Sequence, residues 1–100
     1  MSYVRIWRFE AARGREQEFV TAYGPEGDWV QLFRRSPGYR STELVRPVPT
    51  ERVFLVTDRW ASRQDWDNFL AAHREAYAAL DLRFSALCAS ETELDEYEAP

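Results

Sequence analysis

The chain has 100 residues with a formal net charge of −4, and 45% of them are apolar, which is typical of one globular domain. All 13 cationic side chains are arginine, so there is no lysine for Schiff-base chemistry or for a phosphate-binding loop. The negative charge does not fit nucleic acid, and no apolar run reaches the roughly 18 residues that span a membrane. We therefore expect a cytoplasmic protein with no nucleic acid and no membrane among its partners.

The first third of the chain predicts a strand and a broken helix. Residues 3–10 alternate with period two and carry apolar side chains on both faces, which favours a strand covered on both sides. Helical spacing follows from about Arg15. The Gly-Pro-Glu-Gly stretch at 24–27 interrupts that helix, because proline removes a backbone donor. Asp28 is then expected to cap a second helical piece over residues 29–35.

The middle of the chain predicts a hairpin. Ser-Pro-Gly at residues 36–38 ends the preceding helix. Residues 39–45 and 52–60 read as two strands, and the proline-containing loop 46–51 between them cannot extend either one. We expect these two strands to pair antiparallel.

The last third predicts a capped helix and an acidic strand. Ser62 with Asp65 three positions later is a capping-box pattern that marks a helix start. Apolar residues then recur at spacings of three and four, which fits one long helix or two pieces over 63–71 and 73–88. Residues 92–98 read as an acidic strand near an edge of the sheet, and the acidic tail 91–98 is expected to be solvated.

The order of these elements, β-α-β-β-α-β, predicts the fold class. It is the ferredoxin-like α+β arrangement, a four-stranded antiparallel sheet with helices on one face, as one domain over residues 1–100. The other face would be uncovered in a monomer. The 15 aromatic residues exceed what one small core holds, so we expect a homodimer through sheet-to-sheet packing.

Three segments carry a resemblance to a known family. They are Gly-Pro-Glu-Gly-Asp-Trp at 24–29, Ser-Pro-Gly-Tyr at 36–39, and Asp-Arg-Trp at 58–60 followed by Ser62. Together with the element order, they resemble the antibiotic biosynthesis monooxygenase-like family over roughly residues 3–98. The resemblance implies a dimeric α+β barrel with one pocket per subunit between sheet and helices. It also implies oxidation of aromatic phenols or quinols by molecular oxygen, with no metal or flavin cofactor.

A haem-degrading branch of the family is not matched. It uses an asparagine on the first strand, then a tryptophan and an iron-ligating histidine on the last helix; the aligned residues here are Trp7, Phe69 and Ala79. His73 lies about six residues too early and has no partner at metal-ligand spacing. Cys88 is the only cysteine, which excludes an intrachain disulfide and a cysteine zinc site, and we expect it to be an inert thiol on the inner side of the last helix.

The candidate acid–base residues lie on the third strand and the last helix. His73 is the only side chain whose ordinary pKa is near neutrality, and Tyr77 lies four residues on along the same helical face. Asp58 would orient His73 through a direct hydrogen bond. The alternatives are a half-buried histidine that holds the helix against the sheet, and an Asp58 carboxylate paired with Arg5, Arg40 or His73.

The candidate substrate-binding residues are aromatic. Trp7 shares a strand face with Arg5 and would form a flat apolar wall beside a cation, which suits a phenolate. Trp60 and Phe69 are the other candidates for this wall. The alternative, which tryptophans in small domains follow more often, is that Trp7, Trp60 and Trp66 belong to the core, because aromatic side chains fill small interiors.

Three functions are consistent with these residues. The first is a cofactor-independent monooxygenase in which His73, with Tyr77 or Asp58, removes a phenolic proton and Arg5 stabilises the anion. The second is a module that binds a small aromatic ligand without turnover. The third is a dimer whose pocket is filled by its own side chains. An open cavity of a few hundred Å³ meeting His73 would favour the enzyme.

Overall fold

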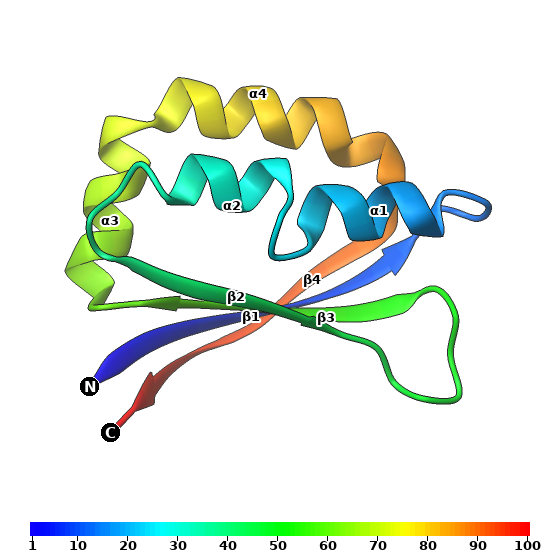
Figure 1. The fold of residues 1–100 in the computed structure, drawn as a ribbon, viewed down its shortest axis with the longest axis horizontal. Coiled ribbons are helices and arrows are strands. Elements are labelled where there is room, and N and C mark those ends of the chain that lie inside the picture. The colour runs from blue at the N-terminus through cyan, green and yellow to red at the C-terminus, as the bar shows by residue number, and fades with distance from the viewer.

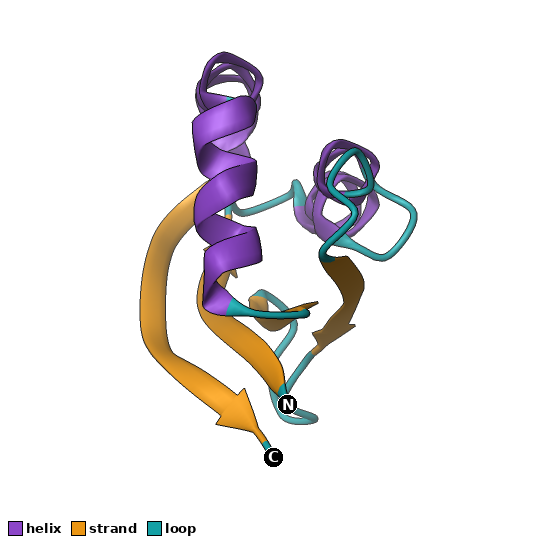
Figure 2. Ribbon diagram, turned by 90° about the vertical axis from the view of Figure 1, so that its left-hand side faces the viewer, coloured by secondary structure: helices purple, strands orange, loops and turns teal.

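The structure, a computed structural model of residues 1–100, is a four-stranded antiparallel sheet with its helices packed on one face (Figures 1 and 2). The sheet order is β2-β3-β1-β4. The ferredoxin-like α+β prediction is therefore confirmed. The elements in chain order are β1 (Ser2–Ala11), α1 (Glu16–Tyr23), α2 (Asp28–Phe33), β2 (Tyr39–Val45), β3 (Val53–Trp60), α3 (Arg63–Ala72), α4 (Arg74–Phe84), a 3-10 turn (Ser85–Leu87) and β4 (Cys88–Ala99).

β1 is a central strand, and its alternation fixes which side chains reach the helices. It pairs with β3 so that Arg5 lies opposite Asp58 and Trp7 opposite Val56. On its other side it pairs with β4, with register shifts after Ile6 and near the end of β1. The odd-numbered residues of β1 face the helices, since Phe9 contacts aromatic rings of α1.

The break between α1 and α2 differs in one detail from the expectation. Gly27, not Asp28, is the N-cap of α2, and Asp28 is its first helical residue. A Cβ on Gly27 would lie 2.2 Å from the Ala22 carbonyl oxygen, so only glycine permits this close approach. In the first turn the Asp28 carboxylate still interacts favourably with the helix dipole, and it pairs with Arg83 at 3.3 Å, which links α2 to α4.

The second helical region consists of two pieces that meet at His73. Ser62 caps α3, because its side chain accepts a hydrogen bond from the Asp65 backbone N–H at 3.1 Å, as the capping box predicts. His73 has φ −125° and ends α3 as well as starting α4. The chain therefore turns at His73. Cys88 is the first residue of β4 rather than the end of a helix, and it is partly buried; the prediction that placed it on a helix was wrong.

The core between sheet and helices is aromatic. Trp60 is fully buried, and its ring centroid lies 5.1–5.4 Å from four neighbouring rings, those of Phe33, Tyr39, Trp66 and Phe69. Burying one large apolar side chain stabilises a fold by about 1.5–3 kcal/mol. This cluster therefore holds α2 and α3 on the sheet.

The opposite face of the sheet has no helix over it (Figure 2). By strand alternation and register it carries Ile6 on β1, Leu55 on β3, Val45 on β2 and Tyr97 on β4. Val45 and Tyr97 are each 44% exposed. None of the helices has the length and apolar character that crossing a membrane requires.

Candidate functional site

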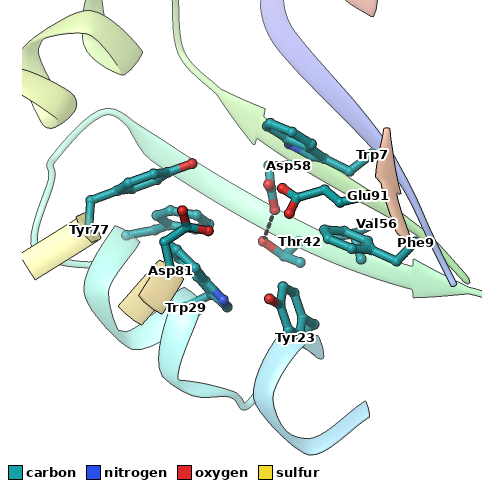
Figure 3. Close-up of a pocket in the computed structure, with 11 residues that line it drawn as sticks. Trp7, Phe9, Tyr23, Trp29, Thr42, Val56, Asp58, Tyr77, Asp81 and Glu91 are labelled. Carbon is teal, nitrogen blue, oxygen red and sulfur yellow. Dashed lines mark hydrogen bonds between the residues drawn. The ribbon is translucent and has the colours of Figure 1, made fainter. Parts of the chain in front are cut away.

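A cavity lies between the sheet and helices α1, α2 and α4 (Figure 3). Its lining is mostly aromatic with a few polar groups: Trp7, Phe9, Tyr23, Trp29, Phe33, Thr42, Val56, Asp58, Tyr77, Asp81 and Glu91. The cavity volume is about 40 Å³. That volume admits water molecules, whereas pockets for drug-sized ligands have roughly 300 Å³ or more. The condition that would favour the enzyme, an open cavity of a few hundred Å³ that meets His73, is not met, because the aromatic side chains occupy most of the space.

Asp58 is the buried carboxyl group of this cavity. It is 5% exposed, and its Oδ1 accepts a hydrogen bond of 2.6 Å from the Thr42 hydroxyl. Thr42 in turn accepts a hydrogen bond of 2.8 Å from the Tyr39 hydroxyl. The second carboxyl oxygen of Asp58 has no hydrogen-bond partner in the protein. Burial raises the pKa of Asp58 to about 6, against the lowering effects of Thr42 and of the Arg5 charge.

Tyr77 reaches the cavity from α4, and its hydroxyl points inward (Figure 3). Burial raises the pKa of Tyr77 to about 12, with a further contribution from the negative charge of Asp81. Tyr77 is therefore a neutral phenol at physiological pH, which makes it a hydrogen-bond donor rather than a base. Burial also raises the pKa of Tyr23, whose hydroxyl accepts a hydrogen bond of 3.5 Å from the Cys88 thiol.

Two more carboxyl groups line the cavity at its exposed side. Asp81 projects from α4 and Glu91 from β4 (Figure 3). Burial, and then the charge of Asp81, raise the pKa of Glu91. Glu91 is a residue that the sequence analysis missed, because it was assigned to the solvated acidic tail. Its register partner is Phe9, whose side chain faces the helices, so Glu91 faces them too.

Arg5 lies beside the cavity but does not line it. Its guanidinium packs over the Trp66 ring at 4.5 Å from the centroid and lies 5.4 Å from that of Trp7. It donates hydrogen bonds to Glu93 and to the Tyr3 hydroxyl. Arg5 is only 8% exposed. Its terminal nitrogens are thus engaged by side chains of β1 and β4 and its Nε–H has no partner, so Arg5 does not line the cavity as the expected cation beside a phenolate would.

His73 lies outside the cavity lining. Its ring packs on Phe69 with centroids 5.4 Å apart, at the turn between α3 and α4. It forms no side-chain hydrogen bond to Asp58, whose partner is Thr42 instead. The expected Asp58–His73 pair was therefore wrong, because the helix breaks at His73 and displaces its side chain from the face that carries Tyr77.

The remaining aromatic candidates separate into wall and core. Trp7 lines the cavity and is half-buried. Trp60 and Phe69 are 0% and 1% exposed, do not line it, and belong to the core cluster. The structure thus brings together Trp7, Asp58 and Tyr77 from the predicted set.

Comparison with known proteins identifies the class. The family model described as antibiotic biosynthesis monooxygenase matches residues 2–79, so the chain belongs to this family. A search of curated proteins gave no significant match.

Solved structures share the fold. SnoaB, a cofactor-independent oxygenase from Streptomyces nogalater, is similar with a TM-score of 0.80 and 17% identity, over 99% of this chain and 93% of that chain. A proposed antibiotic biosynthesis monooxygenase from Deinococcus radiodurans has a TM-score of 0.76 and 14% identity, over 98% and 92%. PA3566 from Pseudomonas aeruginosa has a TM-score of 0.71 and 14% identity, over 99% and 94%. At these identities the likeness concerns the fold alone.

Proposed function

We propose that the protein is a cofactor-independent monooxygenase that oxidises a small planar phenol or quinol in the cavity between sheet and helices. The observation that carries this proposal is Asp58, a buried carboxyl group with a free oxygen inside an aromatic cavity. A base with a pKa of about 6 is ionised at neutral pH and still accepts a proton from an activated phenol. Membership of the family supplies the reaction class.

The chemistry needs three contributions from this chain. The free oxygen of Asp58 removes the phenolic proton, and the neutral Tyr77 hydroxyl donates a hydrogen bond to the developing oxyanion. The positive charge of Arg5 lowers the pKa of Asp58, which opposes the effect of burial and favours the ionised carboxylate. The apolar walls exclude water and hold the ring flat.

The substrate supplies the electrons. A carbon of the substrate anion that still bears one hydrogen forms a bond to molecular oxygen. Addition of a proton to the outer oxygen then gives a hydroperoxide. The remaining hydrogen then leaves that carbon as a proton while the O–O bond breaks. One oxygen atom stays in the product as a carbonyl group, and the other leaves as water.

Binding a ring requires the cavity to widen. Trp7 and Tyr77 are half-buried, so their rotation has fewer packing contacts to break than rotation of a core residue. Trp29 and Phe33, which line the same cavity, are buried and would stay in place. We propose Trp7 and Tyr77 as the walls that move when a ligand enters.

A second candidate function rests on the small volume of the cavity. A dimeric module that binds a small aromatic ligand without turnover needs no space for oxygen beside the ring. The same residues would then act only in binding. Oxygen consumption separates this candidate from the first.

The test is oxygen uptake by chelator-treated, flavin-free protein with an anthrone or a simple hydroquinone. The proposal expects uptake above the buffer rate, one oxygen consumed per anthrone, and water rather than hydrogen peroxide as the second product. Saturable ligand binding without uptake would instead support the binding module. The absence of both oxygen uptake and ligand binding would contradict both candidates.

We also propose that the protein works as a homodimer whose two sheets face each other. The support is the face of the sheet that no helix covers, which carries Ile6, Leu55, Val45 and Tyr97 beside charged residues such as Arg8 and Glu43. Leu55→Glu places a charge on this face and is expected to convert the dimer to a monomer, because an unpaired buried charge is unfavourable. Leu82→Glu on α4, where Leu82 is 80% exposed, is the matched control. Sedimentation measures the result, and a wild-type monomer would contradict the proposal.

A further inference from the structure

The charged groups that line the cavity are all negative. Asp58 comes from β3, Asp81 from α4 and Glu91 from β4, so three elements each contribute one carboxyl group. The lining contains no arginine and no histidine. The three groups do not form a cluster that could hold a metal ion. A ligand that enters meets carboxylates and aromatic rings.

These carboxyl groups lack cationic partners. None of the three forms an ion pair within 4 Å, and Arg5, which lies beside the cavity, is paired with Glu93 and Glu96. Arg83, which lies on α4 near Asp81 in sequence, is paired with Asp28 instead. Asp81 and Glu91 therefore have no ion-pair partner within the chain, and the charge of Arg5 acts on Asp58 from outside the lining.

Two polar groups of the lining are available to a ligand. Trp29 is 7% exposed, and its buried Nε1–H interacts with the Tyr23 hydroxyl without completing a hydrogen bond. Asp58 is 5% exposed, and its second oxygen has no donor in the chain. Polar groups inside proteins are normally hydrogen-bonded, so this donor and this acceptor in one cavity indicate a site that takes a polar ligand.

We infer that the ligand is a small phenol that carries a protonated amine. Its ring lies between Trp7, Trp29 and Tyr77, with which it can stack. Its hydroxyl reaches Asp58, and its ammonium lies near Asp81 and Glu91, which are the exposed carboxyl groups at the mouth. Aromatic ligands with a carboxylate are repelled.

The inference deepens the proposed function and rests on it for the location of the substrate. Removing the phenolic proton would place an anion beside carboxylates. An ammonium group on the same ligand offsets that repulsion, in a cavity that Arg5 does not line. The ligand thereby supplies the cation that the lining lacks.

The test compares three phenols that differ in the charge of one substituent. They are tyramine, which is cationic, tyrosol, which is neutral, and 4-hydroxyphenylacetate, which is anionic. Binding is measured by calorimetry under argon, so that turnover plays no part. We expect tyramine to bind at least about tenfold more tightly than 4-hydroxyphenylacetate, which corresponds to about 1.4 kcal/mol, with tyrosol between them. Equal affinities, tightest binding of the anion, or binding of none of the three would overturn the inference.

A variant without the charges of Asp81 and Glu91 tests whether these two residues cause the preference for a cationic ligand. Asp81→Asn with Glu91→Gln is expected to reduce the difference between tyramine and 4-hydroxyphenylacetate to below about threefold while tyrosol affinity stays unchanged. Asp67→Asn is the control, because Asp67 is exposed on α3 and does not line the cavity. If the double variant still binds tyramine more tightly than 4-hydroxyphenylacetate by the wild-type factor, the placement of the ligand's ammonium near Asp81 and Glu91 is overturned.

The two proposals fail in different ways. A charge preference under argon without oxygen uptake from the catechol analogues of the three phenols would contradict the monooxygenase and leave the ligand class standing. Uptake at equal rates for all three charges would support the monooxygenase and contradict the ligand class.

Discussion

Asp58→Asn is expected to lower kcat/KM for oxygen uptake by about 10²- to 10⁴-fold, which is the usual contribution of a general base. Asparagine has nearly the same shape, and its carbonyl oxygen can still accept the hydrogen bond from Thr42. The variant therefore removes the base without removing the packing. Oxygen uptake under steady-state conditions measures the loss.

The same substitution is expected to stabilise the fold at neutral pH. The pKa of Asp58 is raised from 3.8 to about 6, so the folded state binds more protons than the unfolded state between those values. Stability therefore falls as the pH rises through this window, by about 3 kcal/mol at about 1.4 kcal/mol per pKa unit. Asparagine does not ionise, so Asp58→Asn escapes this loss. Urea denaturation of both proteins at pH 4 and pH 7 measures the difference.

The activity of the wild-type protein has the opposite pH dependence. Only the ionised carboxyl group is a base, so kcat/KM is expected to rise with pH through about 6 and then to level off. His73→Ala is the comparison, because the sequence made His73 the candidate base but the structure places it outside the cavity lining. We expect it to leave the rate and the pH profile unchanged. A large loss in His73→Ala, with a normal rate in Asp58→Asn, would contradict this assignment of the base.

Local signals in the sequence were sufficient for most of the fold. The capping box at Ser62 and the Gly-Pro-Glu-Gly stretch at 24–27 act through neighbouring backbone groups, so their effect is visible in the sequence itself. Period-two alternation in residues 3–10 likewise gave the strand. Asp28 was misplaced by one position, because the close approach that requires Gly27 at the cap involves the preceding helix.

The candidate site was less predictable, because it depends on contacts between distant elements. Glu91 faces the cavity only through its pairing with Phe9, and a register shift in β4 lies between that pair and the start of β1. His73 lies outside the predicted site because helix α3 ends at this residue. Apolar spacing of three and four does not reveal such a turn. The cavity volume follows from side-chain packing, which no local pattern contains.

The assignment of Trp60 to the core and of Trp7 to the cavity leads to the second large effect. Trp60→Ala is expected to destabilise the protein by about 3–5 kcal/mol, the usual range for removing a buried aromatic side chain. For a domain of this size the midpoint of thermal unfolding should fall by at least about 12 °C. The physical reason is that Trp60 is fully buried and contacts rings from α2, β2 and α3. Circular dichroism with temperature measures the shift.

Trp7→Ala is the matched control, because it makes the same chemical change at a half-buried wall of the cavity. We expect it to destabilise the fold by less than half as much and to raise KM for aromatic ligands. Trp60→Phe keeps a ring in the core and removes an indole Nε1–H that has no hydrogen-bond partner, so its stability should stay within about 1.5 kcal/mol of wild type and its KM should not change. A raised KM in Trp60→Phe with unchanged stability would make Trp60 part of the ligand wall. An unchanged KM in Trp60→Phe with a raised KM in Trp7→Ala would assign Trp60 to the core that holds the sheet and helices together, and Trp7 to the wall that a substrate must move.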